Sequence, residues 1–230
     1  MKKIFCVICI LIINGLYVYS QMKANDAYEF PIKQGTKEWG QFETVEKRIA
    51  ALQIPSAVLT NISTEGLLET CLAFPYLTDM FFYNNYQKGF EELLAEFNGF
   101  QELFKRRDLI NVLLEKYQSL STDVTGVRLL KEVDQGRFTF RDFVLEFMLT
   151  QDVVFKNLNS EQKKQLFLVS FENKKVKEIY SDIFGNLNKL PTDLLYVKEA
   201  LNDPSFKLGS ADSKESLSSF IEAPLFLDRL

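Results

Sequence analysis

The sequence has no histidine, and it has little cysteine, glycine or proline. Its 230 residues include three Cys, ten Gly, six Pro and a single Trp. Without histidine, the chain cannot form a Ser–His–Asp triad, a Cys–His dyad or an HExxH zinc site. The low Gly and Pro content excludes collagen-like and low-complexity architectures. Because 47% of the residues are hydrophobic, we expect a folded core rather than a disordered chain.

The N-terminal residues have the pattern of a secretory signal peptide. Two lysines precede an apolar run over 4–16, and Val18 and Ser20 fit the exit of that run. A membrane anchor is the alternative, but a spanning helix needs about 20 apolar residues and this run is shorter. We therefore predict a signal peptide over 1–20, a mature chain that begins at Gln21, and a secreted or periplasmic location.

Removal of the signal peptide changes both the charge and the cysteine content. The remaining chain has 25 basic and 31 acidic residues and one cysteine, Cys71. This negative balance disfavours a nucleic-acid partner. A lone cysteine cannot form an intramolecular disulfide, so we expect the hydrophobic core to hold the fold.

Beyond the signal peptide, hydrophobic residues repeat at helical spacing almost throughout. The segment with Phe90, Leu93, Leu94 and Phe97 is typical of this pattern. Only the stretch 135–140 resembles a strand, and it fits the start of a helix equally well. We predict an all-α fold, built as an α-solenoid-like array or an irregular bundle of short stacked antiparallel helices. No fixed repeat supports a TPR or HEAT register.

The chain divides by composition into four segments. These are the signal peptide 1–20, an irregular arm 21–36, a helical domain 37–202, and a polar linker with a C-terminal tail 203–230.

Capping residues predict where several helices begin and end. We expect N-caps at Ser63, Asp108, Thr139 and Ser160, and helix stops at Gly99 and Gly185. The helix that begins at Ser160 is expected to continue to residue 184. Its apolar seam is interrupted by Asn173, and a polar residue in such a seam can fix how helices pair.

Three pairs of carboxylates fall four residues apart on predicted helices. They are Glu65 and Glu69, Glu92 and Glu96, and Asp142 and Glu146. A glycosidase uses two carboxyl groups about 5–10 Å apart, so this spacing permits hydrolysis. The same spacing is common on solvated helix faces, and we predict that each pair is solvated.

The remaining charged and sulfur-containing candidates have ordinary structural interpretations. The basic runs 105–107 and 174–177 fit an anion or glycan site, or the charged end of a helix, which we favour. Cys71 lies on an apolar helix face, so we predict a buried core residue. Asn61 begins an N-x-S acceptor motif, which matters only in a eukaryotic secretory pathway.

The densest aromatic segment is the candidate binding site. It consists of Phe81, Phe82, Tyr83, Asn84, Asn85 and Tyr86. Three consecutive aromatic residues on a helix span roughly 200°, which is wider than one apolar stripe, so one ring is expected to face solvent. A helix buried on two sides is the alternative. Exposed rings beside amides suit a peptide, protein or glycan partner. No metal or organic cofactor is expected, because the usual ligand sets and phosphate-binding loops are missing.

Several short motifs are similar to those of a known group of proteins. They are Phe30-Pro31-Ile32-Lys33, Ile54-Pro55, Ser63-Thr64-Glu65 and Phe97-Asn98-Gly99. In these motifs the chain resembles exported proteins of Bacteroides-like bacteria that have no assigned activity, over roughly residues 28–120. The resemblance implies a bacterial envelope or extracellular setting and supplies no catalytic residue.

These observations favour a secreted, non-catalytic binding or scaffold protein of the bacterial envelope. A carboxylate-based hydrolase and a carrier of an apolar ligand are the alternatives. A hydrolase should bring acidic groups with raised pKa values together in a cleft. A carrier should enclose an apolar cavity.

Overall fold

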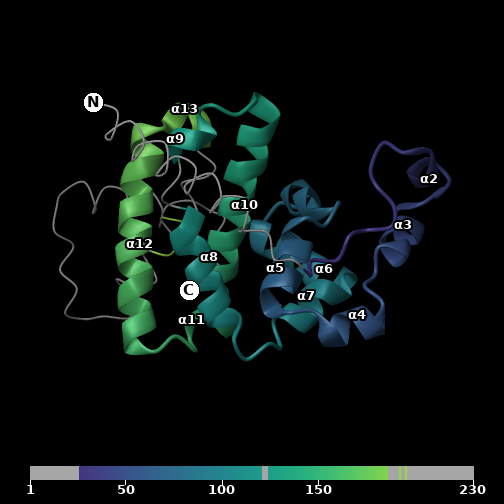
Figure 1. The fold of residues 1–230 in the computed structure, drawn as a ribbon, viewed down its shortest axis with the longest axis horizontal. Coiled ribbons are helices and arrows are strands. Elements are labelled where there is room, and N and C mark those ends of the chain that lie inside the picture. The colour runs from purple at the N-terminus through teal and green to yellow at the C-terminus, as the bar shows by residue number, and fades with distance from the viewer. Residues whose placement is uncertain (1–25, 121–123, 186–191, 193–194, 196–230) are drawn as a thin grey trace, which may run out of the picture. The chain divides into compact units, whose positions relative to one another are not determined.

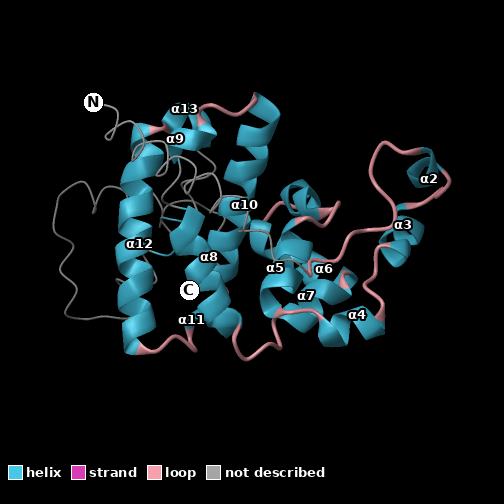
Figure 2. Cartoon of the chain, in the orientation of Figure 1, coloured by secondary structure: helices cyan, strands magenta, loops and turns pink. Residues whose placement is uncertain are grey.

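The computed structural model describes residues 26–120, 124–185, 192 and 195. These residues form twelve α-helices and one 3-10 helix, and no strand occurs among them (Figure 2). The prediction of an all-α fold is confirmed for this part of the chain. The predicted signal peptide and the predicted tail 203–230 lie outside the described residues. The chain divides into two compact units, with the boundary between Arg106 and Arg107. The sequence predicted one helical domain over 37–202.

Unit 1, which ends at Arg106, consists of short helices. They are α2 (Lys37–Gly40), α3 (Val45–Ala51), α4 (Ser56–Asn61), α5 (Thr64–Leu72), η1 (Leu77–Phe82), α6 (Tyr86–Glu96) and α7 (Asn98–Leu103). Helix α7 contacts both α5 and α6, and α6 contacts the 3-10 helix η1 (Figure 1). Helices this short are unstable alone, so their packing against one another supplies most of their stability.

Phenylalanine rings form much of the core of unit 1. Phe90, Phe97 and Phe100 have no exposed surface. Phe97 stacks on Phe74 with ring centroids 4.2 Å apart, and Phe90 meets Phe100 edge to face. Phe30, from the arm that precedes α2, lies 5.9 Å from the ring of Phe97. Four phenylalanines of this unit, Phe74, Phe90, Phe97 and Phe100, therefore belong to its interior.

The described part of the arm, residues 26–36, contains no helix and is tied to α5. Ser63 caps α5 as predicted, because its side chain accepts a hydrogen bond from the backbone N–H of Gly66. The Ser63 hydroxyl and backbone N–H both donate to Asp26, and these bonds lower the pKa of that carboxyl. The backbone N–H of Tyr28 donates to the hydroxyl of Thr70.

Unit 2, which begins at Arg107, contains the long helices. Its elements are α8 (Leu109–Leu120), α9 (Val124–Val127), α10 (Glu132–Thr150), α11 (Asp152–Phe155), α12 (Ser160–Ile179) and α13 (Ser181–Phe184). Helices α8, α10 and α12 run roughly alongside one another, and α8 contacts both of the others (Figure 1). Every residue from 142 to 150 of α10 is buried, so this half of α10 is enclosed on all sides.

Four predicted helix ends were wrong: the caps at Thr139 and Ser160, the helix end at residue 184 and the helix stop at Gly99. Helix α10 begins at Glu132, seven residues before the predicted cap Thr139, whose hydroxyl instead donates to Gly136 within the helix. The strand-like stretch 135–140 therefore lies inside α10. Gly136 within this stretch costs the helix only about 1 kcal/mol, which α10 tolerates because its second half is buried.

The cap of α12 is Asn159 rather than Ser160, and it forms a reciprocal capping box with Gln162. The helix predicted to reach residue 184 is broken at Tyr180, which separates α12 from α13. Gly185 follows the last turn of α13, as predicted. Gly99 is the second residue of α7 rather than a helix stop. A side chain there would collide with the ring of Phe97, so close packing explains this glycine.

Candidate functional site

The aromatic segment predicted as a binding site spans a turn between two helices of unit 1. Phe81 and Phe82 end η1, Tyr83 is extended, and Tyr86 begins α6. The prediction that Phe81, Phe82 and Tyr83 share one helix is therefore wrong, because Tyr83 lies outside η1, and the angular argument built on it does not apply. The expectation of an exposed ring nevertheless holds, because Phe82 is 83% exposed.

The six residues of this segment divide into those that hold the turn and those that face outward. Asn85 caps α6, since its side chain accepts a hydrogen bond of 2.7 Å from the backbone N–H of Gln87. Phe81 and Tyr86 pack edge to face, with ring centroids 5.3 Å apart. The other three residues, Phe82, Tyr83 and Asn84, are exposed or half-buried, and we call them the aromatic surface.

Close backbone packing fixes the two helices that flank the aromatic surface. A Cβ atom added to Gly89 of α6 would lie 2.3 Å from the carbonyl oxygen of Met80 in η1. Met80 and Phe90 have no exposed surface, so η1 and α6 are both anchored in the core. The aromatic surface is therefore presented by a rigid base.

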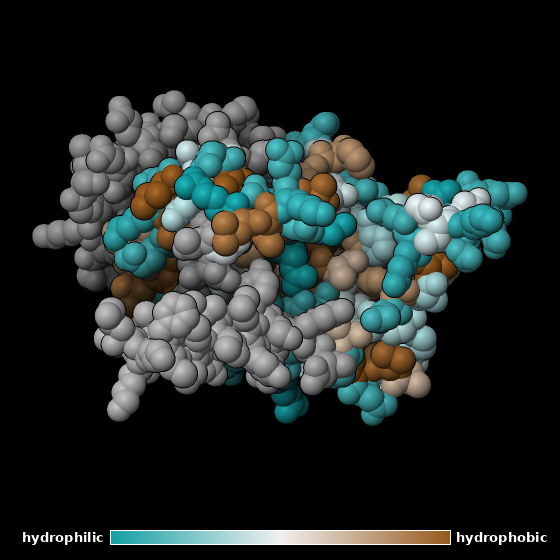
Figure 3. Space-filling view, turned by 45° about the horizontal axis from the view of Figure 1, so that its top comes forward, coloured by the Kyte–Doolittle hydropathy of each residue, from teal (hydrophilic) through white to brown (hydrophobic). Residues whose placement is uncertain are grey.

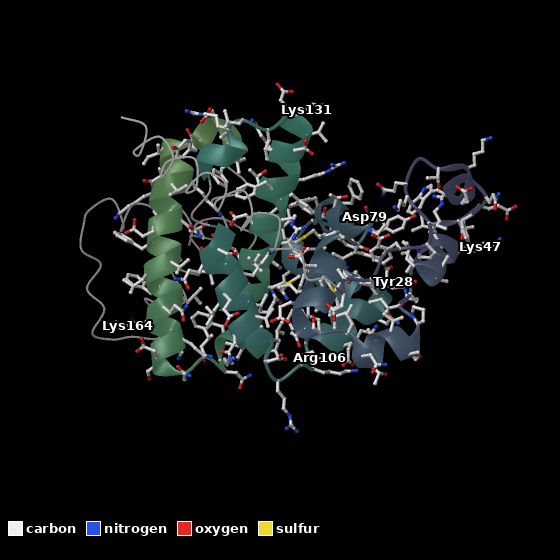
Figure 4. All side chains as sticks on the ribbon, in the orientation of Figure 1. Tyr28, Lys47, Asp79, Arg106, Lys131 and Lys164 are labelled. Atoms are coloured by element: carbon white, nitrogen blue, oxygen red, sulfur yellow. The ribbon has the colours of Figure 1, made fainter. Side chains whose placement is uncertain are left out.

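Three acidic side chains act on Tyr83 through their charge. Burial raises its pKa, and Glu92, Glu96 and Asp79 add to that rise through their charge. Glu92 and Glu96 lie four residues apart and so share a face of α6, while Asp79 belongs to η1, where Figure 4 labels it. The aromatic surface thus lies in a negative field.

Figure 3 shows how hydrophobic residues are distributed on one face of the molecule. On the face shown in Figure 3, hydrophobic side chains of the described residues appear in separate groups between hydrophilic ones. Phe82 is the most exposed aromatic residue among those described.

A second cluster of functional groups lies in the interior of unit 2. Lys177 of α12 places Nζ 2.6 Å from Oε2 of Glu146 and 2.5 Å from Oδ2 of Asp142, both on α10. The hydroxyl of Tyr117 on α8 donates to Oε1 of Glu146 at 2.6 Å. The hydroxyl of Thr192 lies 2.8 Å from both carboxylate oxygens of Glu146 and 3.0 Å from Lys177 Nζ. We call these five residues the buried network.

The buried network holds two carboxylates and one ammonium group, so it carries a net negative charge when all three are ionised. Burial raises the pKa of Glu146 to about 7; the charge of Lys177 opposes this rise, and that of Asp142 adds to it. Burial alone would lower the pKa of Lys177, but the two carboxylates outweigh burial and raise it. The pKa of Tyr117 lies well above its usual value, first because of burial and then because of Glu146. The network therefore takes up a proton near neutral pH.

The buried network is closed to solvent. Its five residues are at most 4% exposed, and Asn173, which lies beside Tyr117, is 3% exposed. Each carboxylate is occupied by a side chain of the protein. The network has the perturbed pKa values of an active site, but its carboxylates have no free surface for a substrate.

The structure corrects two sequence-based interpretations of these residues. Asp142 and Glu146 were predicted to be solvated, and Lys177 was predicted to belong to a charged helix end; all three are buried. Charge alone led to these errors, because unpaired charged residues are almost never buried. Tyr117 and Thr192 were missed altogether. The apolar seam interrupted by Asn173 was the signal that polar contacts lie inside this helix pairing.

The other candidates have structural roles. Cys71 has no exposed surface, and burial raises its pKa well above the usual value, so the prediction of a buried residue is confirmed. Glu65 and the Glu92–Glu96 pair are not buried, but Glu69 is only 8% exposed, so the prediction that it is solvated is wrong.

In the basic run 105–107, Arg106 donates to the carbonyl oxygen of Leu59 and pairs with Glu102. Asn61, of the acceptor motif, is exposed, and its side-chain amide donates to the carbonyl oxygen of Ala57.

Within the described ranges, no group of three or more Cys, Asp or Glu side chains is arranged to hold a metal ion. Over the same residues, no helix combines the length and the hydropathy needed to span a membrane. Comparison of the chain with protein-family models, with curated proteins and with solved structures finds no match. The resemblance to exported proteins of Bacteroides-like bacteria therefore stays a prediction.

Proposed function

We propose that the chain is a non-catalytic binding or scaffold protein of the bacterial envelope, and that it takes a peptide segment of its partner on the aromatic surface. The observation that carries this proposal is the 83% exposure of Phe82. Aromatic side chains are enriched at binding interfaces, where they supply large contact area at small entropic cost. The anchored helices on either side of this ring reduce that cost further.

The buried network supports a non-catalytic role. Asp142 and Glu146 are the acidic residues whose arrangement most resembles a hydrolytic pair, yet Lys177 contacts both of them. Their burial leaves no position for a substrate or an attacking water. The network instead ties α8, α10 and α12 together, which is a structural role within unit 2.

Export and the finer architecture belong to the same proposal. The basic start and apolar run of the first twenty residues support a cleaved signal peptide, and short helices with short connections support an α-solenoid-like stack. The intact mass of the exported protein tests cleavage, because we expect a chain that begins at Gln21. Retention of residues 1–20 in the exported form would contradict it.

The binding proposal is tested with a random library of twelve-residue peptides selected on the immobilised full chain. The selected peptides are then titrated against the wild type, F82A and V45A. Val45 is also an exposed apolar residue of unit 1, 43% exposed, and is the matched control. We expect F82A to weaken binding by about tenfold or more, as loss of a central aromatic contact does, and V45A to have little effect. Selected peptides that bind F82A as well as the wild type would refute the proposal.

A further inference from the structure

Building on the proposed function, we infer that the segment bound at the aromatic surface is cationic: an extended peptide that places Lys or Arg side chains over the exposed ring and between the neighbouring carboxylates. The geometry behind this inference is the packing of η1 on α6. Asp79 belongs to η1, Glu92 and Glu96 share a face of α6, and all three are close enough to Tyr83 for their charges to act on it.

The negative charges of these carboxylates repel one another, and besides burial this repulsion raises the pKa of Glu96. Burial raises the pKa of Glu96, and the charges of Glu92, Asp79 and Glu46 raise it further. Burial also raises the pKa of Asp79. Like charges that repel one another across a surface are relieved when a cation binds among them.

No cation of the described residues neutralises this group. Neither Asp79, Glu92 nor Glu96 forms an ion pair with a described Lys or Arg. Lys88 precedes Glu92 by four residues on α6, but the two are not paired. Over residues 26–106 the sequence has twelve acidic and seven basic residues, a net charge of −5. A cationic partner is therefore attracted both by the local carboxylates and by the unit as a whole.

The aromatic surface adds specificity to this attraction. The face of an exposed ring binds an ammonium or guanidinium group through a cation–π interaction, and this chain already uses that contact elsewhere. The guanidinium of Arg48, for example, lies 5.6 Å from the ring centre of Trp39 in the same unit. Phe82 offers an open ring of this kind three residues after Asp79 in η1 and next to Tyr83, on which the three carboxylates act, whereas an anionic segment would meet repulsion.

The test measures the affinity of fluorescein-labelled peptides of equal length for the full chain by fluorescence anisotropy. The probes are an Arg/Lys-rich peptide, an uncharged peptide of the same aromatic content and a Glu-rich peptide, with neutral maltohexaose as a competitor. The variants are F82A, the site triple D79N/E92Q/E96Q, and the charge-matched control triple E29Q/E38Q/E65Q. The control changes three exposed carboxylates of unit 1 that lie outside the set around Tyr83.

We expect the basic peptide to bind best, to lose about tenfold in affinity with F82A and with the site triple, and to bind the control triple almost as well as the wild type. Equal losses in both triples would show general charge attraction only and overturn the inference. The uncharged peptide or maltohexaose could instead bind in a way that F82A weakens and the site triple does not affect. This result would overturn the cationic partner but leave the binding function. If F82A weakens the binding of none of the probes, both the cationic partner and the binding function of the aromatic surface are contradicted.

Discussion

Lys177 and Glu146 lie 31 residues apart in the sequence, and their charged atoms Nζ and Oε2 lie 2.6 Å apart in the interior of unit 2. The ammonium group also contacts Asp142, so one cation serves two buried carboxylates. Taking such charges out of water is costly, and the cost is offset only while each group keeps its partners. This dependence makes the buried network sensitive to single substitutions.

The first prediction concerns removal of the cation. K177M leaves Asp142 and Glu146 buried without it, and we expect the free energy of unfolding of unit 2 to fall by about 3–5 kcal/mol. Urea denaturation followed by circular dichroism measures the change. The exposed Lys164 of the same helix supplies the control K164M, which should change stability by no more than about 0.5 kcal/mol.

The variant D142L/E146L/K177M removes all three charges at once. Because no unpaired charge then remains, we expect it to recover much of the stability lost in K177M. Equal stability of K177M and K164M would show that the network is not buried in solution.

The second prediction concerns pH. The pKa of Glu146 is raised from 4.5 to about 7 in the folded protein, so the folded state binds this proton more tightly than the unfolded state does. The stability from this group is present in full below about pH 4.5 and is lost as the pH rises through about 7. We expect the free energy of unfolding to fall by on the order of 2 kcal/mol between pH 5 and pH 8.

The absence of histidine leaves this pH window almost free of other side-chain titrations. The groups that contact Glu146 are Tyr117, Lys177 and Thr192, with the charge of Asp142 nearby. E146Q should remove most of the slope, whereas E115Q, on the exposed face of α8, should keep it. A slope unchanged in E146Q would assign the effect to another group.

The third prediction compares two glycines. In G89A the new methyl group would meet the backbone of Met80 at 2.3 Å, and neither backbone can yield easily, so we expect unit 1 to be destabilised by about 1–3 kcal/mol. In G136A the methyl group meets nothing within 4 Å on α10, and we expect a gain of about 0.5–1 kcal/mol. Thermal melts of both variants measure the difference. A neutral G89A would mean that η1 and α6 are not packed backbone to backbone.

The fourth prediction concerns Cys71. Its thiol has no exposed surface, and its raised pKa keeps it protonated at neutral pH, so we expect slow labelling by a thiol reagent until denaturant is added. C71S should cost about 1–3 kcal/mol, because it buries a hydroxyl in an apolar site. Rapid labelling of the native protein would contradict this placement.

The sequence predicted the helical class and several helix ends well, because these depend on local spacing and capping. Ser63 caps α5, and Gly185 follows the last turn of α13. The start of α10 was missed because Thr139 has only a weak local preference for a cap, and the helix, whose second half is buried, continues through it.

The candidate sites were harder to predict. The expected exposed ring was found in Phe82, but the reason given for it was wrong, because Tyr83 lies outside η1 and the three rings do not share one helix. The buried network could not be, because Lys177, Glu146 and Tyr117 come from three helices and meet only after packing. Each residue, taken alone, has the sequence context of an ordinary surface or core position.

The most direct test of the binding surface is an amide NMR titration of the isotope-labelled full chain with the Arg/Lys-rich peptide. The account predicts that the largest chemical-shift changes fall on residues 79–86 and on Glu92 and Glu96, and that F82A needs about tenfold more peptide to reach the same changes without altering the rest of the spectrum. Changes confined to residues of unit 2, or changes that persist unaltered in F82A, would contradict the claim that this protein binds its partner at the aromatic surface.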